Sequence, residues 1–261
     1  MVLKIKSLVQ KLTRIFEYKI ILISKNSIEK KLIIELPADM DEGFKEVYEK
    51  CKDYTMTSIE RMYALYKAVE YIVNLKIPGD FVECGVWKGG SSMVMAYTLL
   101  KMKETNRKIY LYDTFRGMTK PTEKDRRISD SLSMIEKWGK LQRNNYTNWA
   151  FSSLNEVKNN MSSTGYPLKK IVYIEGKVED TIPSKVPSHI SLLRLDTDWY
   201  ESTYHELNYL FPLLTKGGVL IIDDYGYWAG AKEAVDKYFG NKNIVILLNR
   251  IDQTGRLGIK L

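Results

Sequence analysis

The chain has 261 residues, 44% of them hydrophobic, and its 40 Lys and Arg against 32 Asp and Glu give a net charge of +8. This size accommodates one large α/β domain with additions, or two small domains. The two cysteines, Cys51 and Cys84, have no C-x-x-C spacing, which excludes a disulfide framework and a structural zinc site and fits a reducing cytoplasm.

Residues 1–40 are expected to form an N-terminal helical extension. Apolar residues between Val2 and Phe16 recur at helical spacing with Lys and Arg among them, which predicts a basic amphipathic helix. Such a helix binds a membrane surface or packs against protein, in its own domain or in a second subunit. We therefore expect a homo-oligomer and leave open a peripheral membrane contact through residues 1–23 at the inner face of the membrane. No run approaches the ~18 apolar residues that a membrane-spanning helix requires.

Residues 41–261 are expected to form one α/β domain, which starts with two helices between Asp41 and Leu75. Thr57 and Glu60 have the spacing of a capping box at the start of the second helix. A turn then leads into the first predicted strand, Phe81–Cys84.

Glycines follow the first strand directly, and an apolar helix restarts at about Ser92. A buried strand that ends in this way places unpaired backbone N–H groups and the positive end of a helix dipole at one point, which suits the anionic part of a small ligand. The spacing of Gly85, Gly89 and Gly90 is not the G-x-G-x-x-G of dinucleotide sites. A strand that ends in Glu-x-Gly resembles instead the first motif of the doubly wound S-adenosylmethionine (SAM) methyltransferases. The alternative is a turn without a ligand.

The second strand, Lys108–Tyr112, ends at Asp113. In a doubly wound sheet an acid at this tip faces the ribose of a bound nucleoside, where it accepts hydrogen bonds from the sugar hydroxyls. The alternative is an acid that caps the next turn.

The connection from Thr114 to Pro167 is long for a link between neighbouring elements. It contains a charged run from Lys120 to Asp130 and two tryptophans, Trp138 and Trp149. The interleaved aromatic residues favour an ordered lid over the substrate. A surface subdomain is the alternative.

Three further strands are predicted at Lys170–Glu175, Ile190–Leu195 and Val219–Ile222, with helices between them and a last short strand at Leu257–Lys260. Strands that alternate with helices form a doubly wound, mostly parallel sheet, here with an antiparallel edge strand.

Paired aspartates end two of these buried strands, as Asp196-Thr197-Asp198 and as Asp223-Asp224. Because adjacent strands lie only ~4.8 Å apart, Asp196 is expected to meet Asp223 or Asp224. Carboxylates at that distance cannot all stay ionised without a cation, and a hard divalent ion such as Mg²⁺ is the natural guest. Aspartates that cap the following helices are the alternative.

With these elements placed, the chain resembles the macrocin O-methyltransferase (TylF-type) family of SAM-dependent sugar O-methyltransferases. The resemblance covers about residues 50–261. The matching blocks are Phe81–Gly90, Asp113–Gly117, Ser153–Asn160, Arg194–Thr203 and Gly217–Gly226.

The resemblance implies a class I, Rossmann-like methyltransferase with a seven-stranded sheet, and Mg²⁺-dependent transfer of the SAM methyl group to a sugar hydroxyl. It implies a metal set of Asp196, Asp223 and Asp224, with Asp196 also the catalytic base. The cofactor contacts that it implies are Glu83, Gly85, Val86, Gly89, Ser91, Ser92, Asp113, Thr114, Arg116 and Gly176. The lid and the amino-terminal helix depart from the family pattern, so the acceptor sugar stays open.

Three other functions are weighed against this interpretation. A nicotinamide-dependent sugar oxidoreductase or epimerase lacks the glycine fingerprint. A SAM methyltransferase with a non-sugar acceptor would share the same cofactor motifs. A non-catalytic or RNA-directed basic protein would need a clustered basic face, whereas the lysines here are dispersed and the predicted crevice is acidic, so we expect no nucleic-acid partner.

Overall fold

The computed structural model describes residues 20–21, 33–34 and 36–261, which fall into two units that are described separately, Met1–Glu46 and Val47–Leu261. In the first unit, β1 (Ile20–Ile21) pairs antiparallel with β2 (Ile33–Ile34). Helix α2 (Glu42–Cys51) begins in this unit and ends in the second. The predicted amphipathic helix and its membrane contact lie, apart from Ile20 and Ile21, outside the described residues.

The second unit is built on a seven-stranded sheet with the order β5-β4-β3-β6-β7-β9-β8. Strands β3 to β7 are parallel, β9 runs antiparallel to β7, and β8 runs antiparallel to β9. The strands are β3 (Asp80–Cys84), β4 (Ile109–Asp113), β5 (Ile171–Glu175), β6 (Ile190–Leu195), β7 (Leu214–Ile222), β8 (Asn249–Arg250) and β9 (Arg256–Ile259). The predicted fold class, a mostly parallel doubly wound sheet with an antiparallel edge, is confirmed.

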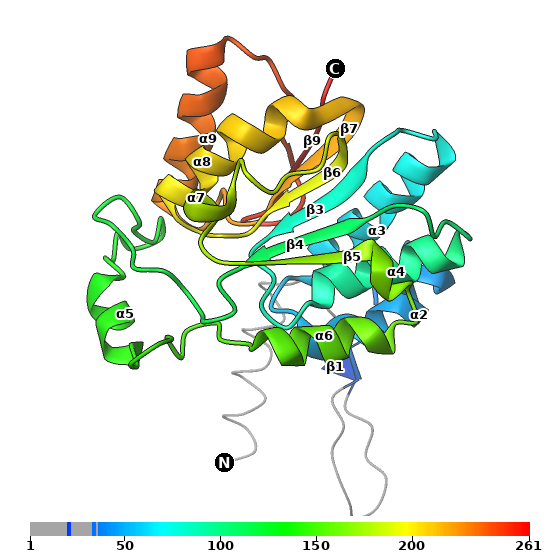
Figure 1. Cartoon of the computed structure of the whole chain (residues 1–261), viewed down its shortest axis with the longest axis horizontal. Coiled ribbons are helices and arrows are strands. Elements are labelled where there is room, and N and C mark those ends of the chain that lie inside the picture. The colour runs from blue at the N-terminus through cyan, green and yellow to red at the C-terminus, as the bar shows by residue number, and fades with distance from the viewer. Residues whose placement is uncertain (1–19, 22–32, 35) are drawn as a thin grey trace, which may run out of the picture. The chain divides into compact units, whose positions relative to one another are not determined.

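Helices cover both faces of the sheet, which explains why all six residues of β6 are buried. Figure 1 shows α3, α4 and α6 on one face and α7, α8 and α9 on the other. The α-helices of the second unit are α3 (Ile59–Asn74), α4 (Gly90–Lys101), α5 (Ile135–Leu141), α6 (Leu154–Ser163), α7 (Val178–Thr181), α8 (Tyr200–Leu210) and α9 (Ala229–Lys242). Short 3₁₀ helices are η1 (Lys52–Tyr54), η2 (Leu168–Lys170) and η3 (Phe211–Leu213).

Helix α3 begins one residue later than the capping-box prediction. Ser58, not Thr57, is the N-cap, and its Oγ accepts the backbone N–H of Arg61 at 3.2 Å. The Thr57–Glu60 capping box is therefore wrong. The consequence for the site is that Arg61 lies in the first turn of α3.

The strand order reverses between β3 and β6. The chain runs outward from β3 through β4 to β5 and then returns to β6 on the other side of β3. In doubly wound sheets this reversal opens a crevice at the carboxyl ends of the two central strands, because their connections leave in opposite directions. The sheet thus places a ligand site above the ends of β3 and β6.

The long connection after β4 contains α5 and ends in α6, which packs against α4. Its middle part reaches the turn between β7 and α9, where Arg127 forms an antiparallel bridge with Trp228. The Trp149 ring lies 5.7 Å from that of Trp199 and 6.3 Å from that of Trp228, measured between centroids. Aromatic contacts of this kind order a segment. Its role as a lid stays a prediction.

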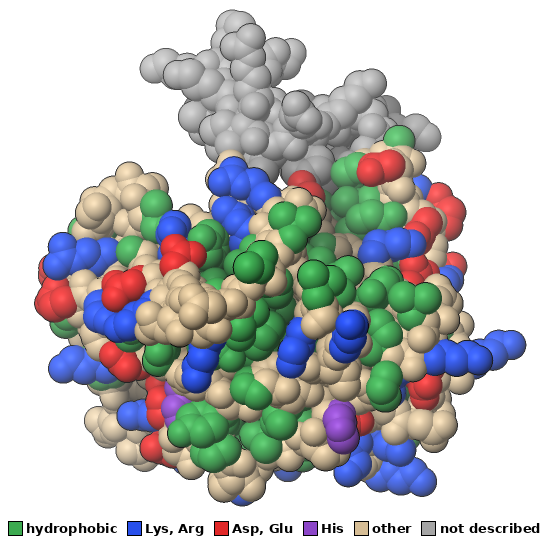
Figure 2. Space-filling view, turned by 90° about the horizontal axis from the view of Figure 1, so that it is seen from above, with side chains coloured by type: hydrophobic (Ala, Val, Ile, Leu, Met, Phe, Trp, Pro, Cys, Tyr) green, Lys and Arg blue, Asp and Glu red, His purple; other side chains and the backbone are tan. Residues whose placement is uncertain are grey.

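Charges are mixed over the face of the molecule in Figure 2, where Lys and Arg alternate with Asp, Glu and apolar side chains. Among the described residues, no helix is both long and apolar enough to cross a membrane.

Candidate active site

A cavity of about 500 Å³ lies at the carboxyl ends of the central strands. The glycine loop after β3 and the ends of β4 and β5 line one side of it, whereas the acids after β6 and β7 and the long connection line the other. The volume falls within the range of pockets that hold small molecules.

Gly85 lets the ends of β3 and β6 approach each other. Its φ is +84°, and a Cβ built on it would lie 2.0 Å from the carbonyl oxygen of Asp196. The backbone N–H of Asp196 in turn donates to Cys84 at 2.8 Å. Any side chain at position 85 would therefore collide with the backbone of Asp196 and force it to shift.

Asp113 holds the glycine loop in place. Its Oδ2 accepts the backbone N–H groups of Val86 at 2.7 Å and Trp87 at 3.1 Å, and its Oδ1 accepts that of Phe115 at 2.7 Å. Trp87 and Phe115 both have positive φ, +47° and +51°, which costs energy for large side chains. Burial raises the pKa of Asp113 in spite of these bonds. The structure thus gives Asp113 a positioning role, and its ribose contact stays a prediction.

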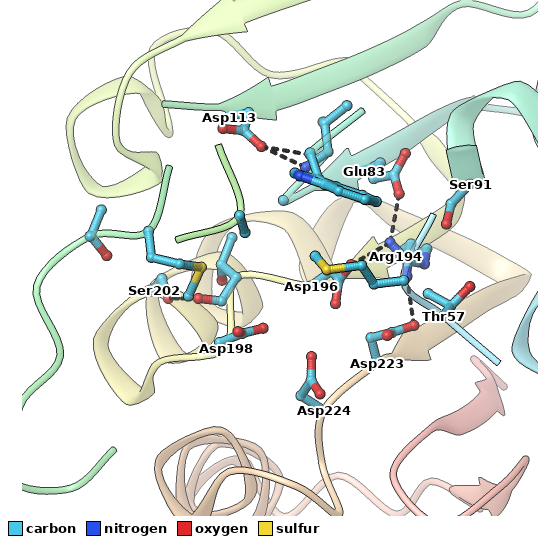
Figure 3. A pocket seen from close by; sticks show the side chains of 18 of the residues that line it. Thr57, Glu83, Ser91, Asp113, Arg194, Asp196, Asp198, Ser202, Asp223 and Asp224 are labelled. Carbon is cyan, nitrogen blue, oxygen red and sulfur yellow. Dashed lines mark hydrogen bonds and ion pairs between the residues drawn. The ribbon is translucent and has the colours of Figure 1, made fainter. Parts of the chain in front are cut away.

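Arg194 is a fully enclosed cation at the floor of the cavity (Figure 3). It donates to Glu83 at 2.6 Å, to Asp196 at 2.9 Å and to Asp223 at 2.6 Å. The strand register explains why these acids surround Arg194. Glu83 in β3 is the direct partner of Arg194 in β6, and Arg194 is in turn the partner of Ile221 in β7. Asp223 comes two residues after Ile221 and so points to the same face as Arg194.

Asp223 does not join the other aspartates. Its second oxygen pairs with Arg61, whose Nε lies 3.0 Å from Asp252, so guanidinium groups hold both oxygens of the carboxylate. Asp223 lines the cavity, but its negative charge is already balanced. This arrangement differs from the predicted metal set of Asp196, Asp223 and Asp224.

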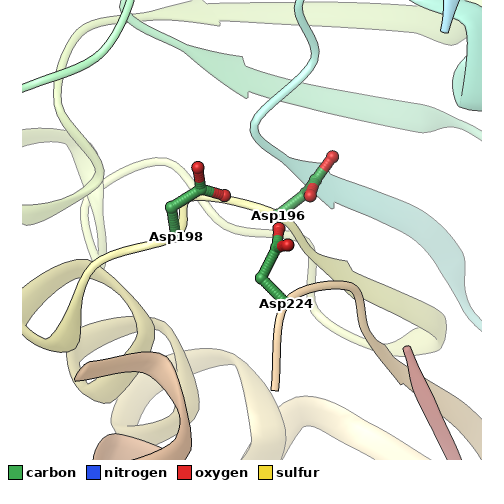
Figure 4. A group of neighbouring side chains, drawn as sticks. All are labelled: Asp196, Asp198 and Asp224. Atoms are coloured by element: carbon green, nitrogen blue, oxygen red, sulfur yellow. The ribbon is translucent and has the colours of Figure 1, made fainter. Parts of the chain in front are cut away.

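Asp198 takes the place of Asp223 in the acidic group. Carboxylate oxygens of Asp196, Asp198 and Asp224 lie within 4.8 Å of one another, in the loops after β6 and β7 (Figure 4). Burial and mutual repulsion raise the pKa of Asp196 and of Asp224 well above the ordinary value, and they raise that of Asp198 to about 7. Asp198 also has a φ of +72°, an uncommon conformation for a residue other than glycine. We call these three residues the acidic trio.

Seven of the ten predicted cofactor contacts line the cavity: Glu83, Gly85, Val86, Ser91, Asp113, Thr114 and Gly176. The other three do not line the cavity and make contacts within the fold. Ser92 is fully buried and donates to Glu83, Gly89 is the left-handed N-cap of α4, and Arg116 forms a surface pair with Glu175.

Three residues of the site were not among the predicted contacts. The sequence contains a sign that Arg194 is functional, because it is the one charged residue in the apolar run Ile190–Leu195. Asp198 is two residues after Asp196 in the same motif. The motif alone does not show which of the two side chains turns toward the neighbouring strand. Arg61 had no signal, because charged residues occur throughout α3.

This sheet, with a cavity at its switch point and acids at the strand ends, defines a doubly wound enzyme of the class I methyltransferase type. The model of the macrocin-O-methyltransferase (TylF) family matches residues 18–257. The chain belongs to this family. It is accordingly a SAM-dependent O-methyltransferase.

Relatives of this chain are similar to it over most of their length. An 8-demethyl-8-(2,3-dimethoxy-alpha-L-rhamnosyl)-tetracenomycin-C 4'-O-methyltransferase of Streptomyces olivaceus is 33% identical over 77% of this chain and 74% of that protein. A mycinamicin III 3''-O-methyltransferase of Micromonospora griseorubida is 30% identical over 80% of this chain and 82% of that protein. The solved structure of the O-methyltransferase NovP has a TM-score of 0.69 at 27% identity and covers 79% of this chain and 82% of its own.

Proposed function

We propose that this protein transfers the methyl group of SAM to a hydroxyl of a sugar, with Mg²⁺ held by Asp196, Asp198 and Asp224. The observation that carries the proposal is the acidic trio, which borders the same cavity as the glycine loop after β3. The relatives support a sugar acceptor, since the name of the Streptomyces olivaceus enzyme specifies a rhamnosyl-bearing substrate.

The residues on the β3 side of the cavity suit the cofactor. Gly85, Val86 and Ser91 line it near the start of α4, and Thr114 and Gly176 follow the ends of β4 and β5. When bound, SAM supplies a methyl group on a sulfonium, which reacts with a nucleophile in a single displacement. The backbone N–H groups at the start of α4 are suited to an anionic group of the cofactor.

The acidic trio fits a divalent cation on grounds of charge. The positive charges of Arg194 and Arg61 already pair with the carboxylates of Glu83 and Asp223. Among the described residues, no Lys or Arg forms an ion pair with Asp198 or Asp224. Three oxygen ligands from carboxylates are the donor type that Mg²⁺ prefers. When bound, Mg²⁺ supplies a Lewis acid that orients hydroxyl oxygens and favours their deprotonated form.

Two members of the trio are candidates for the proton acceptor. Asp196 is the base that the sequence predicts, but one of its oxygens accepts from Arg194, which stabilises its charged form. Asp198 forms no ion pair with an arginine among the described residues, so neither of its oxygens is held by a guanidinium. The geometry therefore adds Asp198 as a second candidate.

Methyl transfer with and without a chelator tests the proposal. The protein is incubated with methyl-labelled SAM, Mg²⁺ and a sugar-containing metabolite or glycan extract, and we expect a labelled sugar product that disappears when EDTA is added. SAM is also expected to raise the melting temperature, whereas NAD is not. Label that persists undiminished in EDTA would contradict the metal, and label only in non-sugar products would contradict the acceptor.

We further propose that the protein works in the cytoplasm, which its two free, buried cysteines support. Homo-oligomer formation stays a prediction.

A further inference from the structure

The side of the cavity away from the glycine loop carries two cations, Arg127 and Lys137, which the transfer reaction itself does not use. Both belong to the long connection between β4 and α6. They line the cavity together with apolar and aromatic residues that include Met118, Trp149 and Trp228.

Arg127 is fixed to the turn that carries Asp224. It forms a backbone bridge with Trp228, and the N–H of the next residue, Ile128, donates to Tyr227 at 2.9 Å. The backbone N–H groups of Tyr227 and Trp228 donate in turn to the carbonyl of Asp224, at 3.0 and 3.1 Å. Arg127 is therefore joined by a short hydrogen-bonded path to the acidic trio.

The guanidinium of Arg127 has N–H donors that no acceptor among the described residues uses. Asp130 takes only Nη1, at 3.1 Å, and in the described part of the chain nothing accepts the buried Nε–H. The free edge of a guanidinium fits two oxygens of one carboxylate or phosphate.

Lys137 is held at the cavity by an aromatic ring. Its Nζ lies 4.0 Å from the ring centroid of Trp149, which itself packs edge-on against Trp199. The neighbouring acids are taken by other cations, since Glu136 pairs with Lys140 and Glu123 with Arg126. Among the described residues Lys137 has no carboxylate partner, so its charge is available to a ligand.

We propose that the acceptor is an anionic sugar, whose carboxylate or phosphate binds between Arg127 and Lys137 while its reacting hydroxyl faces the acidic trio. This inference rests on the proposed function and names the class of its substrate. A neutral acceptor would leave Lys137 against the Trp149 ring without a counter-charge, and Arg127 with Asp130 as its one carboxylate partner among the described residues. An oxyanion gives the guanidinium of Arg127 a second acceptor beside Asp130 and neutralises Lys137.

Direct binding tests the subsite without turnover. The probes are glucuronate and glucose 1-phosphate, compared with glucose, in the presence of S-adenosylhomocysteine and Mg²⁺ and observed by ligand-detected NMR. Both anions are expected to bind at least about tenfold more tightly than glucose, and Arg127→Gln or Lys137→Gln should remove this advantage. The matched controls Arg126→Gln and Lys140→Gln change neighbouring cations that do not line the cavity, and they should retain it.

The charge of the methylated product gives a second readout. Labelled product from the extract should be retained by an anion exchanger, and a phosphatase that abolishes the retention identifies a phosphate, whereas persistent retention identifies a carboxylate. Equal binding of glucose and the anions, equal losses in Arg126→Gln and Arg127→Gln, or a labelled sugar that is neutral would each overturn the anionic subsite. Anion binding without any methyl transfer would leave the subsite standing and count against the proposed function instead.

Discussion

Replacing Asp224 with asparagine is expected to lower the rate of methyl transfer at saturating SAM and Mg²⁺ by about 10²–10³-fold. Asparagine keeps the shape of the side chain but removes one of the three charges that would hold the cation. The measurement is kcat with labelled SAM. As a second readout, the rise in melting temperature that Mg²⁺ causes in the parent protein should be lost, while the rise caused by SAM should remain.

Asp223→Asn is the matched control, because residue 223 is adjacent and also lines the cavity, but its carboxylate is held by Arg61 and Arg194. This variant is expected to melt at a lower temperature and still to respond to Mg²⁺. The reverse result, in which Asp223→Asn abolishes the Mg²⁺ response and Asp224→Asn retains it, would restore the metal set that the sequence predicts.

Replacing Arg194 with methionine is expected to destabilise the protein by about 3–5 kcal/mol, because it removes the arginine that pairs with buried Glu83 and leaves buried Asp223 with Arg61 alone. For a chain of this size the melting temperature should fall by about 6–20 °C. Protonation of the abandoned carboxylates relieves part of the loss, since removing a nearby cation raises their pKa. Thermal unfolding should therefore show a larger difference from the parent protein at pH 8 than at pH 5.5.

Two further variants separate charge from packing. Arg116→Gln removes a surface pair in which both side chains are substantially exposed, and its cost should stay below about 1 kcal/mol. The double variant Arg194→Met with Glu83→Gln should recover part of the lost stability, because one of the abandoned carboxylates is then neutral. If the double variant is no more stable than Arg194→Met, the loss comes from packing and not from unpaired charge.

The strands were predictable because the central ones are buried on both faces and appear in the sequence as mostly apolar runs, in which Glu83 and Arg194 are the charged exceptions. The prediction Phe81–Cys84 differs from β3 by one residue, and Ile190–Leu195 matches β6. β7 begins earlier than predicted, at Leu214, because the pair Gly217-Gly218 was interpreted as a turn, whereas the strand passes through it. Glycine permits a turn but does not require one.

The acidic site was only partly predictable, because sequence places acids at strand ends without fixing which way each side chain turns. Asp223 turns toward Arg194 as a result of the register between β6 and β7, which depends on the whole sheet. Arg61 reaches Asp223 from a helix more than 160 positions earlier, and nothing local to either residue indicates that contact. The pairing of these two arginines decides which carboxylates remain for a cation.

Anomalous diffraction from crystals grown with Mn²⁺ and S-adenosylhomocysteine would test the central claim most directly. The account predicts one manganese ion in the cavity, bound by carboxylate oxygens of Asp196, Asp198 and Asp224, with Asp223 still paired to Arg61 and Arg194. A cavity without manganese at saturating concentration, or manganese bound by Asp223 with its arginine pairs broken, would contradict it.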